Sequence, residues 1–310
     1  MQLTHLMTKA RRVYPWLPNS LPTQPVFAEP LENMFNPSMI QVVAARQPDV
    51  LSFVCRQHYF DIDKRGIMIG APKFEKSINW LHRAVRTGDQ FRIVKSEPMP
   101  VFNGIEDLRF YKFGNRLYVT GTRPDFAEGK LSYPFVASAL DIGAATTEAD
   151  LRHFELAPRL APIEKNWVYF SDNGQLYLER LPGMKEYYSL DIAAERLAYH
   201  RHAAEPFVWS GTKSVRWRGG NLFLDHKRMY PMQGLATVMR FVYRFRFHAA
   251  GMGPAVLSRE FSLMRETPTP VYASDMAIDE QSILIGVGIG ERVSQILRTP
   301  LSVVARMLEM

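Results

Sequence analysis

The stretch Glu106-Asp107-Leu108-Arg109 holds the residues of this chain best suited to chemistry. Two carboxylates and a guanidinium lie at the start of a run that alternates apolar and polar side chains, which is typical of a strand. Neighbouring side chains of a strand point to opposite faces, so Glu106 and Asp107 cannot both face one site. We expect one of them to enter a site and the other to brace a loop or the arginine. Arg109 would share the face of Asp107 and could orient it or shift its pKa.

Three further stretches place polar or charged side chains next to short predicted strands. They are Asn36-Pro37-Ser38 with Arg46 downstream, Glu164-Lys165-Asn166-Trp167, and the pair Ser210-Gly211-Thr212-Lys213 and Leu224-Asp225-His226-Lys227. Each stretch alone also fits a structural role, such as a proline turn capped by Asn and Ser. An Asp-Arg pair at a sheet edge is often structural too. Their chemistry therefore depends on whether the fold brings them together.

A turn followed by a short apolar strand recurs along the chain. The five strands are centred on Leu51, Leu117, Leu176, Leu222 and Ile283. This recurrence predicts an all-β fold, a five-bladed β-propeller with four-stranded blades and variable loops. A β-sandwich or a set of unrelated hairpins is the alternative. In a propeller, the inner strands line a central channel, and polar residues at their ends converge there.

The rest of the chain adds few elements. Residues 1–35 are expected to form an extended, proline-rich N-terminal lead-in, and residues 36–310 a single propeller domain. Lys76 to Val85 could form a helix within an insertion, and Leu301 to Leu308, after Pro300, is predicted to be a short C-terminal helix. Tyr243 to His248 alternates aromatic and basic residues, which we interpret as an apolar inner face and a charged outer face.

Composition excludes several classes of protein. The single cysteine, Cys55, rules out an internal disulfide. The N-terminus lacks the apolar core of a signal peptide and no run is long enough to span a membrane, so we expect a cytoplasmic protein. The net charge of +7 favours anionic partners. The charge is dispersed and no nucleic-acid-binding motif accompanies it, so we expect no nucleic-acid partner. No His/Cys/Asp/Glu spacing predicts a metal site.

Taken in order from Asn36 to Leu308, these motifs resemble those of the five-bladed β-propeller glycosidases, and most closely the inverting β-mannoside phosphorylases and their relatives. Glu106-Asp107-Leu108-Arg109 is similar to the Glu-Asp-Pro-Arg motif of that family, with Leu108 in place of the proline. Glu164-Lys165-Asn166-Trp167 matches a similar tetrapeptide before a strand. Lys213 stands where the family generally has proline.

The resemblance implies a role for each candidate residue. Asp107 would be the general acid. Residues implied to bind the sugar are Asn36, Ser38, Arg46, Glu106, Arg109 and Asp225. Residues implied to hold phosphate are Arg123, Lys165, His226 and Lys213. Inorganic phosphate would be a co-substrate, no cofactor or metal is expected, and a homo-oligomer is left open.

The reaction implied is phosphate-dependent cleavage or synthesis of a β-mannoside-type bond. An inverting hydrolase needs a second carboxylate ~6.5–9.5 Å from the acid to activate water. Phosphate is already a nucleophile and needs cations to hold it instead. One acid candidate surrounded by cations fits phosphorolysis. A glycoside hydrolase or glycosyltransferase of polysaccharide metabolism on the same fold, and a non-catalytic carbohydrate-binding propeller, are the alternatives.

Overall fold

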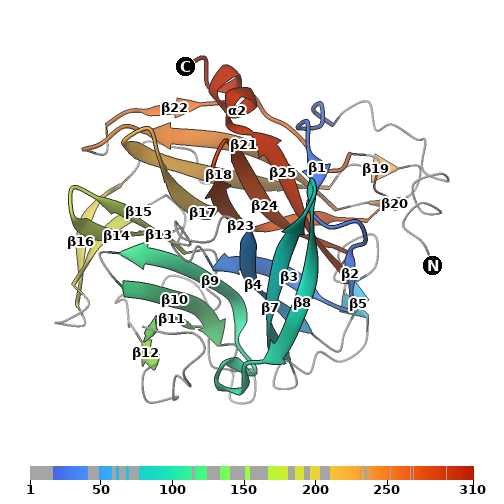
Figure 1. The fold of residues 1–310 in the computed structure, drawn as a ribbon. Helices are drawn as coiled ribbons and strands as arrows, with labels where there is room; N and C mark the ends of the chain where they lie inside the picture. The colour runs from blue at the N-terminus through green and yellow to red at the C-terminus, as the bar shows by residue number, and fades with distance from the viewer. Residues whose placement is uncertain are drawn as a thin grey trace.

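The protein was analysed as a computed structural model (Figure 1). The structure describes residues 17–40, 49–57, 61–62, 68–69, 77–113, 116–123, 133–139, 151–153, 167–180, 186–191, 196–202, 210–230, 232–233, 236–237, 239–251, 253–265, 267, 269–290 and 292–310. Lys165 and Arg46, both predicted site residues, lie outside these ranges. For Arg123 only the backbone is described.

Almost all of the described chain is β-structure, arranged in five large antiparallel sheets and two two-stranded ones. The first sheet contains β3 (Phe35–Ile40), β4 (Val50–Gln57), β7 (Ile78–Thr87) and β8 (Gln90–Pro98). The second contains β9 (Glu106–Phe113), β10 (Arg116–Arg123), β11 (Tyr133–Ala139) and β12 (Leu151–His153). The third contains β13 (Val168–Asp172), β14 (Gln175–Arg180), β15 (Glu186–Asp191) and β16 (Arg196–His202).

The remaining sheets lie in the C-terminal half. The fourth contains β17 (Ser210–Trp217), β18 (Gly220–Met229), β21 (Arg240–His248) and β22 (Ala255–Leu257). The fifth contains β23 (Val271–Asp279), β24 (Ser282–Ile289), β25 (Val293–Pro300), β1 (Gln24–Pro25) and β2 (Leu31–Glu32). The small sheets are β5 (Asp61–Ile62) with β6 (Met68–Ile69), and β19 (Met232–Gln233) with β20 (Ala236–Thr237). The helices are a 3₁₀ turn, η2 (Pro100–Phe102), and α2 (Leu301–Met307).

The first strands of the five large sheets lie next to one another in a ring. β3 contacts both β9 and β23, and β17 contacts both β13 and β23. Arg109 of β9 donates a hydrogen bond to the carbonyl of Trp167, directly before β13, at 3.0 Å, which completes the ring. The sheets extend outward from these strands (Figure 1). This arrangement is propeller-like.

The five recurring strands occupy equivalent positions, as the sequence predicts. Leu51, Leu117, Leu176, Leu222 and Ile283 each lie in the second strand of a large sheet. The apolar core lies between neighbouring sheets. Leu222 and Leu224 of β18, for example, belong to the same fully buried cluster as Ile283 and Ile285 of β24.

Two short strands from the described part of the N-terminal lead-in, residues 17–35, join the last sheet. Gln24 pairs with Arg298 and Leu31 with Ser294, so β1 and β2 both lie along β25. The described part of the lead-in and the last strand of the chain therefore share one sheet. The predicted C-terminal helix is confirmed as α2, which buries Val304 against the fifth sheet's core cluster.

The predicted helix at Lys76 to Val85 is wrong. Residues 78–87 form strand β7, which pairs with β4 on one side and β8 on the other. Leu81 and Ala84 are buried at a spacing that also suits one face of a helix, so periodicity alone was ambiguous. Pairing on both edges favours the strand, because it satisfies the backbone hydrogen-bonding groups of β7.

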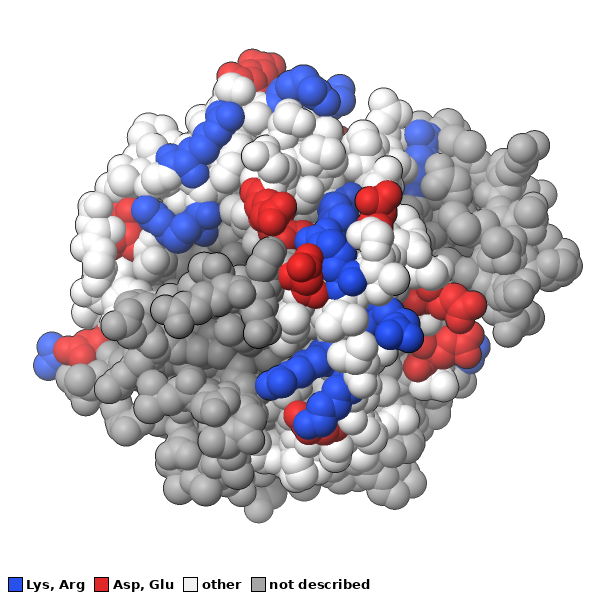
Figure 2. Space-filling model, viewed as in Figure 1, with Lys and Arg blue, Asp and Glu red and all other residues white. Residues whose placement is uncertain are grey.

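The described helices and surface were examined for a membrane-spanning segment and for a basic patch. No helix in the described ranges is long and apolar enough to cross a membrane. On the face shown in Figure 2, basic and acidic side chains are intermixed, and the described residues there form no single basic patch.

Candidate functional site

The inner strands carry a repeated β-bulge where the candidate motifs begin. In β3, Asn36 and Pro37 together oppose one residue of β4, since Phe35 pairs with Arg56 and Ser38 with Val54. The same irregularity lies at Asp107-Leu108 in β9 and at Thr212-Lys213 in β17. Bulges bend a strand and re-aim its side chains, and they are frequent beside active sites.

Two of these bulges begin with a residue in the left-handed region. Asn36 has φ 49° and Asp107 has φ 53°. Asn and Asp tolerate this conformation better than most residues. The two side chains meet, because Asn36 Nδ2 donates a 2.6 Å hydrogen bond to Asp107 Oδ1. The bulges thus place an amide from the first sheet on a carboxylate from the second.

Glu106 and Asp107 are separated as the sequence predicts. Glu106 is buried and forms a 2.8 Å ion pair with Arg56 of β4, which is equally buried. Asp107 is half-buried. Glu106 therefore braces the neighbouring sheet, and Asp107 is the more exposed of the two carboxylates.

The bulge at Asp107 depends on a glycine in the opposite strand. A Cβ at Gly121 would lie 2.7 Å from Ile105 Cγ2 and 3.1 Å from the backbone oxygen of Glu106. The first distance is shorter than Cβ contacts allow and the second is tight, so a side chain at this position would force its neighbours to move and glycine lets the bulged segment pack closely.

A second buried carboxylate, Asp275 of β23, lies next to the Asn36-Pro37-Ser38 stretch. Asp275 Oδ2 accepts hydrogen bonds from the Ser38 hydroxyl at 3.2 Å and from the Met39 N–H at 2.5 Å. Lys213 Nζ of β17 is 2.8 Å from Asp275 Oδ1, which also accepts from the Met276 N–H. Burial raises the pKa of the Asp275 carboxyl, and the Lys213 ammonium acts against that rise.

The segment from Asn36 to Ser38 therefore links two carboxylates from different sheets. Asn36 contacts Asp107 and Ser38 contacts Asp275. Between them, the carbonyl of Pro37 accepts a 2.8 Å hydrogen bond from the Ser274 hydroxyl. A Cβ at Gly286 would lie 2.3 Å from that same carbonyl, so the segment packs directly on β24.

His226, a predicted phosphate ligand, is buried within β18 of the fourth sheet. Its Nδ1 is 3.2 Å from the Thr212 hydroxyl, and Thr212 belongs to the β17 bulge. The ring packs edge-on against Phe241 and Tyr272, with centroids 5.7 and 5.3 Å away. An aromatic wall thus fixes the imidazole.

The structure does not bring Asp225 into this group. Asp225 accepts hydrogen bonds from Arg246 Nε at 2.9 Å and from Arg244 at 3.4 Å. Arg246 also binds Glu179 at 2.7 Å, and all of these side chains are buried. The predicted outward-facing basic stripe at Tyr243 to His248 is therefore wrong. Its arginines face inward because two buried carboxylates neutralise them.

Among the predicted residues, the described contacts connect Asn36, Ser38, Asp107 and Lys213, with His226 linked through Thr212 to the same bulge as Lys213. Arg109 supports the ring through Trp167. Arg123 ends β10, where its neighbour Thr122 pairs with Glu106. Sequence reasoning missed Asp275 and Arg56. Among the described residues, no group of three or more His, Cys, Asp or Glu side chains is placed to hold a metal ion.

Comparison with models of known protein families finds no match, and neither does comparison with curated protein sequences. Solved structures do match. A β-1,2-mannobiose phosphorylase from Listeria innocua, in complex with β-1,2-mannobiose, has a TM-score of 0.56 at 14% identity, over 92% of this chain and 95% of that chain. A GDP-Man-dependent mannosyltransferase from Leishmania mexicana has a TM-score of 0.57 at 8% identity, over 96% and 92%. A glycosyl hydrolase from Bacteroides ovatus has a TM-score of 0.54 at 11% identity, over 94% and 92%.

These similarities define a class by fold. The chain shares its propeller-like fold with mannoside phosphorylases and glycoside hydrolases, so the predicted resemblance is confirmed. The neighbours are carbohydrate-active enzymes that carry out different reactions. The fold alone therefore does not select among phosphorolysis, hydrolysis and sugar transfer.

Proposed function

We propose that this chain is a carbohydrate-active enzyme on a five-bladed β-propeller. The five large sheets are the blades, and their first strands line the central channel. The domain runs over residues 36–310, and the lead-in of residues 1–35 contributes the outermost strands of the last blade. The proposal is supported by the ring of first-strand contacts and by the similarity to solved carbohydrate-active enzymes.

The reaction that we propose is transfer of a sugar, of the β-mannoside type, between a glycoside and phosphate. The observation that carries this proposal is the 2.6 Å contact between Asn36 and Asp107 at two equivalent bulges. Asn36 is 7% exposed, and its Oδ1 atom has no hydrogen-bond partner among the described residues. A buried acceptor without a partner costs free energy, and a sugar hydroxyl would supply the missing donor.

Asp107 is the acid in this proposal. It is half-buried, and the amide of Asn36 fixes its orientation. It would deliver a proton to the leaving oxygen, directly or through a sugar hydroxyl. Glu106 does not compete for this role because Arg56 holds it in the sheet interface.

The second carboxylate favours phosphate over water as the nucleophile. Asp275 is fully buried, with the Lys213 ammonium and two backbone N–H groups directed at its oxygens. Its oxygens are already occupied by these donors and it is shielded from solvent, so it is not placed to activate a water molecule. Phosphate needs no base, and Arg123, Lys165 and His226 are the groups that we assign to holding it.

Cleavage of β-mannosides with and without inorganic phosphate tests this function. A phosphorylase should yield sugar 1-phosphate and show little cleavage without phosphate. Equal cleavage in both conditions would favour the hydrolase. Activity only with a nucleotide sugar would favour a transferase. Sugar binding with no turnover of glycoside, sugar 1-phosphate or nucleotide sugar would favour a non-catalytic propeller.

A further inference from the structure

The fifth sheet supports the inner strand β3 on both sides of Asn36. The Phe35 ring occupies the place that a Cβ on Gly288 would need, and the carbonyl of Pro37 occupies the place that a Cβ on Gly286 would need. A side chain at either glycine would push β3 away. The two glycines therefore set how closely the bulge at Asn36 approaches β24.

Asp275 is the charged group of this support. Its Oδ2 accepts from the Ser38 hydroxyl at 3.2 Å and from the Met39 N–H at 2.5 Å, so it holds the two residues that follow the bulge. Its Oδ1 accepts from the Met276 N–H at 2.8 Å and lies 2.8 Å from Lys213 Nζ. Charge-assisted hydrogen bonds are about twice as strong as neutral ones, so the carboxylate holds β3 more firmly than a neutral carboxyl would.

Lys213 of β17 is the counter-charge of this carboxylate. The two side chains are 5% and 0% exposed. Burial raises the pKa of the Asp275 carboxyl, and the Lys213 ammonium acts against that rise. Without Lys213, Asp275 should therefore keep its proton up to a higher pH.

The other elements packed against β23 bring no second charge to Asp275 among the described residues. β3 and β24 meet its carboxylate with a hydroxyl, a backbone N–H and a glycine. The titratable side chains Tyr243 of β21 and His226 of β18 contact β23 nearer its start, at Val271 and Tyr272. The ionisation of Asp275 therefore depends on Lys213.

We propose that Lys213 is a positioning residue for the acid Asp107. It keeps Asp275 ionised, and the ionised carboxylate holds Ser38 and the rest of β3 beyond the bulge. The bulge in turn places the Asn36 amide on Asp107. This proposal rests on the proposed function, since it takes Asp107 to be the acid. It replaces the role of phosphate ligand that the sequence implied for Lys213.

Loss of the ammonium should change the rate more than substrate binding. In Lys213→Met, a protonated Asp275 should hold β3 more weakly, and Asn36 should orient Asp107 less well. The displacement of a reacting group can cost up to about 100-fold, so we expect kcat to fall by about tenfold to 100-fold while Asp275 is protonated. The rate should recover as the pH rises through the Asp275 pKa. KM for mannose 1-phosphate should change little.

The test measures kcat and KM against pH for phosphate release from mannose 1-phosphate with a panel of acceptor sugars. Lys213→Arg keeps the charge and should keep the wild-type pH profile. Lys213→Met combined with Asp275→Asn removes the titrating group, so its loss of kcat should be independent of pH.

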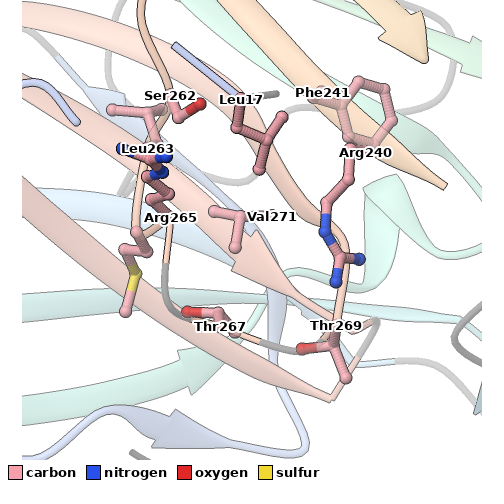
Figure 3. A pocket seen from close by; sticks show the side chains of 10 residues that line it. Leu17, Arg240, Phe241, Ser262, Leu263, Arg265, Thr267, Thr269 and Val271 are labelled. Atoms are coloured by element: carbon pink, nitrogen blue, oxygen red, sulfur yellow. The ribbon is translucent and has the colours of Figure 1, made fainter. Parts of the chain in front are cut away.

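Two control variants lie near this path but outside it. Lys227→Met removes a partly exposed lysine that pairs with Glu260. Thr267→Val alters the segment that enters β23, where Thr267 and Val271 line a small pocket (Figure 3). In the described contacts neither side chain touches Asp275, so both variants should keep the wild-type kcat and pH profile.

Three results would overturn the proposal. The first is a Lys213→Met protein that is less stable but keeps the wild-type kcat and pH profile, which would make the role of Lys213 merely structural. The second is a raised KM with an unchanged pH profile, which would assign Lys213 to phosphate. The third is an added pH dependence that persists in the double variant. If Lys213→Met does not fold, wild-type kcat in the double variant would overturn the proposal instead.

NMR of the Asn36 side-chain amide separates this proposal from the proposed function, because it needs no substrate. Asn36→Ser assigns the signals, and Asp107→Ala gives their positions without the carboxylate. In Lys213→Met the signals should move toward those of Asp107→Ala as the pH is lowered, and signals that stay in place would overturn the proposal. Wild-type protein that turns over no sugar would contradict the proposed function, while the Asn36 signals would still decide whether Lys213 holds the pair.

Discussion

The ion pair between Lys213 and Asp275 should be one of the most costly in the protein to break. The two side chains are 5% and 0% exposed and lie 2.8 Å apart. In Lys213→Met, Asp275 would keep the Ser38 hydroxyl and two backbone N–H donors but lose its counter-charge. Removing one partner of a buried pair costs about 3–5 kcal/mol, because the remaining charge stays desolvated.

The chain offers a matched surface pair as a control. Lys227 lies 2.5 Å from Glu260, with side chains 24% and 44% exposed. Exposed pairs contribute about 0–1 kcal/mol, so Lys227→Met should change the free energy of unfolding little. Urea denaturation of both variants at pH 7 measures the difference. Equal costs for the two variants would refute the reasoning that burial makes the Lys213 pair distinct.

The pH dependence provides a second test of the same pair. Burial already raises the pKa of Asp275, and loss of Lys213 should raise it further. In Lys213→Met the native state then holds a proton that the unfolded chain releases, so stability falls as pH rises above the unfolded carboxyl pKa of about 3.9. The cost of the substitution should therefore be smaller near pH 4 than at pH 7. A cost independent of pH would show that Asp275 does not carry the effect.

Three further substitutions test other parts of the structure. Gly121→Ala would place Cβ 2.7 Å from the Ile105 side chain and should cost about 1–3 kcal/mol in thermal or urea unfolding, whereas Gly253→Ala, with nothing within 4 Å, should be nearly neutral. Burial lowers the pKa of His82 to about 4. The free energy of unfolding should therefore fall by up to about 3 kcal/mol as the pH drops from about 6.5 to 4, and His82→Gln should make it less dependent on pH in this range. Arg246→Met removes the arginine that bridges the buried carboxylates of Glu179 and Asp225, with Arg244 still on Asp225, and should cost at least about 3 kcal/mol. Much of that cost should be recovered when both carboxylates become amides, and an unchanged urea midpoint would contradict the assigned network.

Much of the strand order could be predicted from the sequence, because turns and period-two alternation are local signals. Leu51 and Ile283 each mark the second strand of a sheet, and both follow an inner strand that carries a site residue. The helix expected at Lys76 to Val85 failed because its apolar spacing fits either structure, and pairing with β4 and β8 decides it. Such pairing joins residues far apart in the sequence, so a short stretch of sequence does not reveal it.

The candidate site could be predicted only in part, because its contacts are also non-local. Asn36 and Asp107 stand in motifs that can be recognised, but their contact depends on two bulges that no local pattern reveals. Asp275 lies in β23 at a register shift that follows Ala273, and the contact that marks it, the approach of Lys213 from another sheet, is non-local. The blade repeat carried a partial signal. Asp107 and Thr212 each stand ten residues before their anchor residues Leu117 and Leu222, and the same interval before Ile283 falls at Ala273, two residues before Asp275.

The central claim is that Asp107, oriented by Asn36, is the acid of a sugar-transfer reaction. Its most direct test is phosphate release from mannose 1-phosphate in the presence of a panel of acceptor sugars, compared between the wild-type protein and Asp107→Asn. A general acid contributes about 10²–10⁴-fold, so the variant should lose at least about 100-fold in kcat while its unfolding midpoint stays close to that of the wild type. Turnover by Asp107→Asn within a few-fold of the wild-type rate would contradict the account.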